Sequence, residues 1–414
     1  MSRNDSNKNS RYLLVAFMLT IVIEVMGVGL VFPLLPFLFV SLQNPFIDPS
    51  TAFSLRYLFY GIALATWPMG AFFGAPYLGE LSDKLGRKKI LILSLVLNAC
   101  CYALGAISIY YHLLIIFFIS RFLSGFFGGG YNIVQAAVSD ISKPECKARN
   151  LGWLTLAVAI GLIVGPIIAS FTTDHNWVSW FCLATPFWTA AGLGILNAIL
   201  MIVLFKETYV KAFKGPIRLI KIFSSFLFIF TDLRILLLGI IFFLLNLGWG
   251  FYVTSIPLVV EKLFCFDTKQ MGLFFCVLSF GSIFSILFVQ RKLLKLMSLK
   301  FMYIFVAILI SICLLILFSF PVLENAWILA FMLGLLEVLA YSGLLAMGSN
   351  LVKDSEQGKL MGGFAAVSSI AFIVSGITLG ILSQFHILLP VIIAVLTYLV
   401  SACLMCYVKE VVPR

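Results

Sequence analysis

The sequence contains few charged residues. Of its 414 residues, 11% are charged and 62% are hydrophobic, whereas soluble domains are about 25% charged. It also lacks the phosphate-binding pattern of ATPases, a glycine-rich loop that ends in Lys-Ser or Lys-Thr. These absences exclude an ordinary soluble enzyme and argue against ATP hydrolysis. We therefore expect a membrane protein that is not an enzyme.

The nine cysteines do not suggest a disulfide framework. Most of them lie inside apolar runs, where a thiol packs as a small hydrophobic group. Cys403 and Cys406 have the spacing of a redox pair, but they fall inside the last apolar run. We therefore predict no metal site and no cofactor.

The 28 Lys and Arg residues outnumber the 17 Asp and Glu residues, giving a net charge of +11. They lie between the hydrophobic runs, which is typical of cytoplasmic membrane loops and argues against nucleic-acid binding. The loop cations fall mostly in the two tails and the even-numbered loops, with Arg56, Lys262 and Lys269 as exceptions. This bias predicts a multi-pass protein of a bacterial-type inner membrane, with both termini in the cytoplasm.

Long apolar runs recur throughout the chain. About 20 residues cross the hydrocarbon core of a bilayer, so the length suffices for about twelve crossings with short connections. We predict an all-α membrane protein with twelve transmembrane helices in two six-helix bundles. The predicted helices are 12–40, 57–79, 90–109, 113–137, 151–170, 180–205, 233–257, 271–289, 301–320, 326–349, 360–382 and 387–408.

The sequence repeats weakly across its longest loop. Residues 139–143 resemble residues 349–353 at an offset of 210, and Gly27 and Gly29 have counterparts in Gly248 and Gly250 at an offset of 221. We therefore predict two parallel repeats, as in transporters whose substrate site lies near the midplane between the halves. The predicted domains are an N-terminal six-helix bundle (1–210), a cytoplasmic central loop (211–232) and a C-terminal six-helix bundle (233–414).

A basic loop with two glycines joins the second and third predicted helices. Its candidate gate residues are Gly79, Asp83, Gly86, Arg87 and Lys88. We expect the glycines to allow a tight reversal and Asp83 to lie near a helix N-terminus. The pattern G-x-L-x-D-x-x-G-R-K-K resembles the signature loop of the major facilitator superfamily. This resemblance implies the major facilitator fold and a gate latch in which the acid engages the adjoining bundle.

Other segments extend this resemblance. Arg121, followed by several glycines, resembles the family's arginine motif in helix 4. Gly161, Gly165 and Pro166 resemble the helix 5 motif of drug-proton antiporters. The segment around Glu24 is similar to helix 1 of the tetracycline-proton antiporter branch, which has Asp at that position. The resemblance therefore implies a proton-coupled antiporter of the efflux type, associated with multidrug resistance.

Three ionisable side chains, Glu24, Arg121 and Glu337, are predicted to lie deep in the bilayer, where such groups are costly and usually functional. Glu24 and Arg121 fall at similar depths, because a helix rises about 1.5 Å per residue. They form either a permanent structural pair or a pair that breaks when Glu24 takes a proton. Glu337 is either a second proton site or substrate contact, or a neutral acid hydrogen bonded to Tyr341 or to the backbone.

A few further side chains at depth are candidates for the substrate cavity. They are Asn132, Gln135, Asn246 and Tyr341. The three amides are equally consistent with substrate contact and with hydrogen bonds between helices.

We interpret the sequence as a secondary transporter, a proton-coupled exporter of a small amphiphilic compound. Its expected partners are the substrate, protons and the lipid bilayer, and we expect a monomer. Two alternatives remain: a proton-coupled importer of a nutrient or iron chelate, and a non-transporting membrane signalling protein. The substrate itself stays open, because Cys101 stands where the tetracycline branch has a membrane acid.

Overall fold

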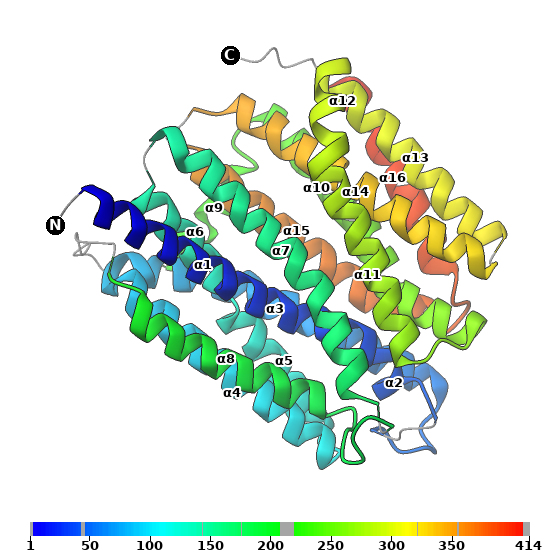
Figure 1. The fold of residues 1–414 in the computed structure, drawn as a ribbon. Helices are drawn as coiled ribbons and strands as arrows, with labels where there is room; N and C mark the ends of the chain where they lie inside the picture. Colours follow the sequence, from blue (N-terminus) through cyan, green and yellow to red (C-terminus); the bar gives the residue numbers. More distant parts are fainter. Residues whose placement is uncertain are drawn as a thin grey trace. The chain divides into compact units, whose positions relative to one another are not determined.

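The computed structural model describes residues 3–42, 46–142, 144–174, 176–207, 219–320, 322–353 and 356–408. This described part contains helices and no β-strand (Figure 1). The helices are α1 (Arg3–Val31), η1 (Phe32–Leu34), α2 (Leu35–Phe39), α3 (Phe53–Leu85), α4 (Arg87–Tyr110), α5 (Leu114–Phe127), α6 (Gly130–Ile141), α7 (Pro144–Thr172), α8 (Thr185–Leu204), α9 (Leu219–Phe228), α10 (Leu233–Phe264), α11 (Thr268–Phe284), η2 (Ser285–Val289), α12 (Gln290–Leu296), α13 (Leu299–Ser319), α14 (Leu323–Leu351), α15 (Gln357–Leu382) and α16 (Leu389–Tyr407).

Twelve helical segments of the described chain are long and apolar enough to cross a membrane. This finding confirms the prediction of an all-α membrane protein with twelve spans. Three spans combine consecutive helices: Tyr12–Phe39, Leu114–Ile141 and Thr268–Leu296. Several span boundaries differ by a few residues from those predicted. The largest differences are at the C-terminal ends, where α3 continues to Leu85, α10 continues to Phe264 and the eighth span continues to Leu296.

Backbone contacts divide the chain into two compact units. The first unit comprises Met1–Leu34 and Met69–Ile222, and the second comprises Leu35–Pro68 and Phe223–Arg414. The segment 35–68, expected in the N-terminal bundle, thus groups with the second unit. Close backbone packing accounts for this grouping, since a Cβ atom at Gly61 would lie 2.5 Å from the carbonyl oxygen of Gly376. Tyr60 also donates a hydrogen bond to the carbonyl of Thr254.

The expected central loop, 211–232, contains the helix α9, so this part of the chain is not a simple connection. Residues 208–218 lie outside the described residues.

Both units contain the same close crossing of two helices. In the first unit α1 packs against α7, and Gly29 faces the ring of Pro166. In the second unit α10 packs against α15, and Gly250 faces the hydroxyl of Ser375. Gly29 and Gly250 are equivalent positions of the predicted repeat, and each lies at a close helix crossing within its own unit.

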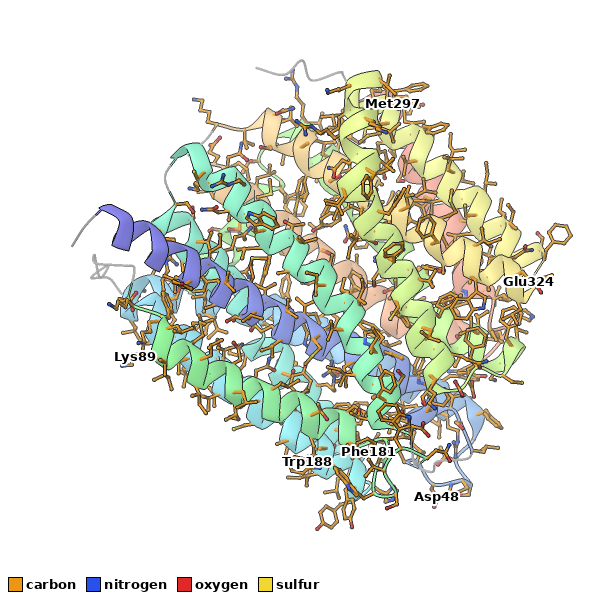
Figure 2. All side chains as sticks on the ribbon, in the orientation of Figure 1. Asp48, Lys89, Phe181, Trp188, Met297 and Glu324 are labelled. Atoms are coloured by element: carbon orange, nitrogen blue, oxygen red, sulfur yellow. The ribbon has the colours of Figure 1, made fainter. Side chains whose placement is uncertain are left out.

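The first unit has a basic end and an aromatic end. In this unit α4 packs along α8, and Lys89 and Trp188 lie at opposite ends of the pair (Figure 2). The side chain of Trp188 is exposed. Such a separation suits a membrane-spanning bundle, because cations favour the cytoplasmic side and tryptophan favours the membrane interface.

The loop before α3 is held together by Arg56, a loop cation in the predicted topology. Its side chain is buried and donates hydrogen bonds to the carbonyls of Asp48 and Thr51. Hydrogen bonds from the hydroxyl and the backbone N–H of Ser50 lower the pKa of Asp48. Arg56 therefore has a structural role in this loop.

Gly74 tests the close helix packing. A Cβ atom there would lie 2.0 Å from the carbonyl oxygen of Phe126 in α5, whereas one at Gly152 would meet nothing within 4 Å. Gly74→Ala should therefore lower the stability by about 1–3 kcal/mol. Gly152→Ala should leave it unchanged or raise it by up to about 1 kcal/mol. The measurement is the thermal unfolding midpoint in detergent, and equal midpoints for the two variants would contradict the packing.

Candidate functional site

The fourth span is broken in the middle, although the sequence predicted one continuous helix over 113–137. The helix α5 ends at Phe127, and α6 begins at Gly130 after two glycines. A Cβ atom at Gly130 would lie only 2.3 Å from Oε1 of Glu24. Glycine at this position thus lets the carboxyl group of α1 approach the N-terminus of α6, which carries a partial positive charge.

Glu24 is buried, with 9% of its surface exposed. Its carboxyl group lies near the backbone N–H groups of Gly130 and Tyr131. Within the described chain, however, neither carboxyl oxygen accepts a hydrogen bond of ordinary geometry. The ion pairs of the described residues do not include Glu24. Glu24 is thus a buried acid at a helix N-terminus, and the described residues provide no counter-ion for it.

Arg121 does not form the hypothesised direct pair with Glu24. Its guanidinium lies over the ring of Tyr102, with Cζ 6.0 Å from the ring centroid. The hydroxyl of Tyr102 lies against α1 at Gly27, where a Cβ atom would be 2.5 Å away. Tyr102 thus contacts both Arg121 and, at Gly27, the segment of α1 about one turn after Glu24. Sequence reasoning missed Tyr102, since aromatic residues are common in apolar helices.

The helix 5 motif sets the position of α1, which carries Glu24. A Cβ atom at Gly161 would lie 2.8 Å from the carbonyl oxygen of Val22, and one at Gly165 would lie 2.5 Å from that of Met26. Pro166 contacts Gly29 one turn further on. The motif residues therefore allow α7 to pack backbone to backbone along the α1 segment that contains Glu24.

Glu337 lies in the second unit and is also buried. The hydroxyl of Tyr398 in α16 donates a hydrogen bond of 2.7 Å to its Oε2 atom. The expected partner, Tyr341, is instead partly exposed and packs against Phe242. A partner 61 residues along the chain could not be identified from sequence spacing.

The expected gate loop is mostly helical. Gly79 lies within α3, and the chain reverses at Gly86, where φ is +100°. Asp83 lies in the last turn of α3 and not at a helix N-terminus. The carboxyl group of Glu207 occupies that place instead, accepting hydrogen bonds from the backbone N–H groups of Arg87 (3.0 Å) and Lys88 (3.1 Å). A helix N-terminus favours a carboxylate because its first N–H groups lack partners.

Arg87 is the centre of an ion-pair cluster within the first unit. Its Nη1 atom lies 3.0 Å from Oδ1 of Asp83, and its Nε atom lies 2.5 Å from Oδ2 of Asp140 in α6. The side chain of Lys88 instead donates to the carbonyl of Ile202 in α8. The Arg87 cluster thus ties α3 and α4 to the C-terminal end of the broken fourth span. Sequence reasoning missed Asp140, an acid at the predicted cytoplasmic end of helix 4.

The candidate cavity amides have different environments. Asn132 and Gln135 are exposed on α6, opposite the buried side chains of Ile133 and Val134. Asn246 is buried, donating to the carbonyl of Phe242 and accepting a hydrogen bond from Ser368. The side chain of Asn246 therefore links α10 to α15.

The Arg87 cluster should restrain α6. Asp140→Asn should weaken the tie by about 1 kcal/mol after solvent screening is considered, so amide exchange in α6 should rise about fivefold. The measurement is hydrogen-deuterium exchange followed by mass spectrometry, with peptides of α5 as an internal reference. Glu80→Gln, which breaks the local pair of Glu80 with Lys84, is the control and should leave α6 unchanged. Equal exchange of α6 in both variants would refute the restraint.

Comparisons with known proteins agree with this architecture. The sequence matches the Major Facilitator Superfamily over residues 17–376 and, in a second match, over residues 238–414. It is 30% identical to the class B tetracycline resistance protein of Escherichia coli over 194 residues, which cover 47% of this chain and 44% of that protein. The chain thus spans less than half the length of this relative in the alignment.

Two further similarities extend over most of the chain. The class C tetracycline resistance protein of Escherichia coli is 28% identical over 374 residues, covering 88% of each chain. The crystal structure of a D-xylose-proton symporter has a TM-score of 0.74 and 15% identity, covering 99% of each chain. At this low identity, the structural match supports the fold alone.

Proposed function

Because the chain belongs to the Major Facilitator Superfamily, we propose that it is a proton-coupled exporter of a small amphiphilic compound. The match confirms the family resemblance inferred from the loop motif, and a transporter of this family is not an enzyme. The proposal places the protein in a bacterial-type inner membrane, with both termini in the cytoplasm and the even-numbered loops carrying most cations. We expect a monomer that binds no nucleic acid.

The burial of Glu24 is the observation that carries the proposal. A carboxylate without a counter-ion is costly in a membrane span and is usually functional there. Glu24 has no ion-pair partner among the described residues. The cost of its negative charge therefore favours the binding of a proton. Glu337 is the second proton site of the proposal, with Tyr398 as its hydrogen-bond donor.

Protonation of Glu24 changes how α1 interacts with α6. The ionised carboxyl group is attracted by the N-terminus of α6, whereas the neutral group is not. Such an interaction contributes up to about 2 kcal/mol in a partly buried setting. Proton binding therefore releases α1 from α6, and in the proposed cycle the released state exchanges substrate for proton. Arg121, which contacts Tyr102 and does not form an ion pair with Glu24, adds a longer-range attraction for the ionised form.

The Arg87 cluster is the proposed gate. It joins the ends of α3 and α4 to α6, and Glu24 approaches the opposite end of the same helix α6. A change at Glu24 therefore acts on a helix that is held at its other end by Asp140. Asn132 and Gln135 of α6 are the proposed substrate contacts, because they are exposed on the face opposite the packed one.

The direction of transport rests on the relatives. Two proteins similar to this chain are named for tetracycline resistance, and a membrane transporter confers resistance when it removes the drug from the cell. A proton-coupled importer is the second candidate, because the chain also resembles a D-xylose-proton symporter in fold. A drug and metabolite sensitivity screen of a deletion strain identifies the substrate, and flux in an imposed pH gradient gives the direction.

Glu24→Gln should abolish uphill transport. The amide preserves the shape of a protonated acid but cannot release a proton, so pH-driven accumulation in proteoliposomes should fall to background. Glu24→Asp should retain part of the activity, because it keeps a titratable group. The probe is a compound to which the deletion strain is sensitive. The control is Glu324→Gln, which changes an exposed acid of α14. Uphill accumulation by Glu24→Gln would exclude Glu24 as the carrier and leave Glu337 as the candidate.

A further inference from the structure

A small cavity lies beside Glu24 inside the first unit. Its volume is about 10 Å³, which is close to the room that one water molecule requires. Helices α1, α4 and α8 line it, with Glu24, Asn98, Tyr102, Gly194 and Asn197 among the lining residues. Although most of the surrounding helix surface is apolar, several polar groups thus converge on a space of molecular size.

Two polar side chains of this cavity have buried atoms that find no hydrogen-bond partner among the described residues. They are both carboxyl oxygens of Glu24 and the Nδ2 atom of Asn197. Asn197 is 1% exposed and Glu24 is 9% exposed. A buried polar atom without a partner costs about 1–3 kcal/mol, so two such residues in the lining of one cavity point to a shared ligand.

The orientation of Asn197 is set by α1. Its Oδ1 atom lies 3.0 Å from the hydroxyl of Thr20, which is about one turn before Glu24. The amide of Asn98 is likewise engaged, because its Oδ1 atom accepts a hydrogen bond from Ser124. The contact with Thr20 holds the amide of Asn197 beside the cavity, and the contact with Ser124 holds that of Asn98. A water molecule both donates and accepts, so it suits either atom of the amide.

We propose that this cavity is a binding site for one water molecule, which bridges Glu24 and Asn197 and exchanges the proton of Glu24. This inference rests on the proposed function of Glu24 and adds the group with which the acid reacts. In the exchange step, the O–H bond of the protonated carboxyl group breaks and the proton joins the water oxygen. The reverse transfer returns a proton to the carboxylate. When a solvent molecule replaces the bound water between two such cycles, the carboxyl group receives a hydrogen from the solvent.

Gly194 lines the cavity at a place where α8 packs closely against α4. A Cβ atom at Gly194 would lie 3.0 Å from Cβ of Ala99 in α4, so a larger residue would have to occupy the cavity or displace α4. Gly192 lies two residues earlier on the same helix, and a Cβ atom there would meet nothing within 4 Å. The two glycines therefore provide a matched pair for filling the cavity or leaving it open.

The test is deuterium exchange of the Glu24 carboxylic acid, followed by infrared difference spectroscopy on the purified full-length protein without substrate. The carbonyl band of Glu24 is assigned by its loss in Glu24→Gln. Gly194→Val should slow the exchange about tenfold, the factor that corresponds to one lost hydrogen bond to an ionised group. Gly192→Val should exchange at the native rate.

Asn197→Leu provides a second variant in case Gly194→Val fails to fold. It keeps the branched shape of the side chain, removes the polar partner of the water and should also slow the exchange. Native exchange rates in Asn197→Leu, or in a folded Gly194→Val, would overturn the water site. That result is separate from a failure of the proposed function, because uphill transport by Glu24→Gln is measured in a different experiment and requires a substrate.

Discussion

The electrostatic cost of a carboxyl group inside a membrane span is the constraint on which the first unit depends. Glu24 has no counter-ion among the described residues, so its surroundings decide whether it holds a proton or a charge. Three features create these surroundings: α7 packs closely along α1, the fourth span breaks at Gly130, and Tyr102 reaches α1 at Gly27. Glycine is required at each contact, because a Cβ atom would collide with the neighbouring group.

Most of the fold could be predicted from local properties of the sequence. Each of the twelve spans contains an apolar stretch long enough to cross a bilayer, and bilayer thickness sets that length. The break between α5 and α6 could not be predicted, because three consecutive glycines are also compatible with close helix packing. The grouping of 35–68 with the second unit depends on the contact of Gly61 with Gly376. Such a contact involves residues more than 300 positions apart.

The candidate site divides into residues that composition reveals and residues that only the tertiary structure reveals. Glu24, Arg121 and Glu337 are conspicuous because ionisable groups are rare in apolar helices. Their neighbours Tyr102 and Tyr398 are not, since tyrosine is an ordinary residue of such helices. A search for every polar side chain inside the apolar runs would have identified Asn197 as a candidate site residue. A search for acids at the predicted cytoplasmic ends of helices would similarly have identified Asp140 and Glu207, which organise the basic end of the first unit.

The central claim is that substrate and proton compete through Glu24. Its most direct test is proton release when a substrate identified by the sensitivity screen is added to purified protein in weakly buffered detergent solution. The account predicts release from the native protein and from Glu324→Gln, and none from Glu24→Gln, although Glu24→Gln still binds the compound. Equal proton release from Glu24→Gln and the native protein would contradict the account.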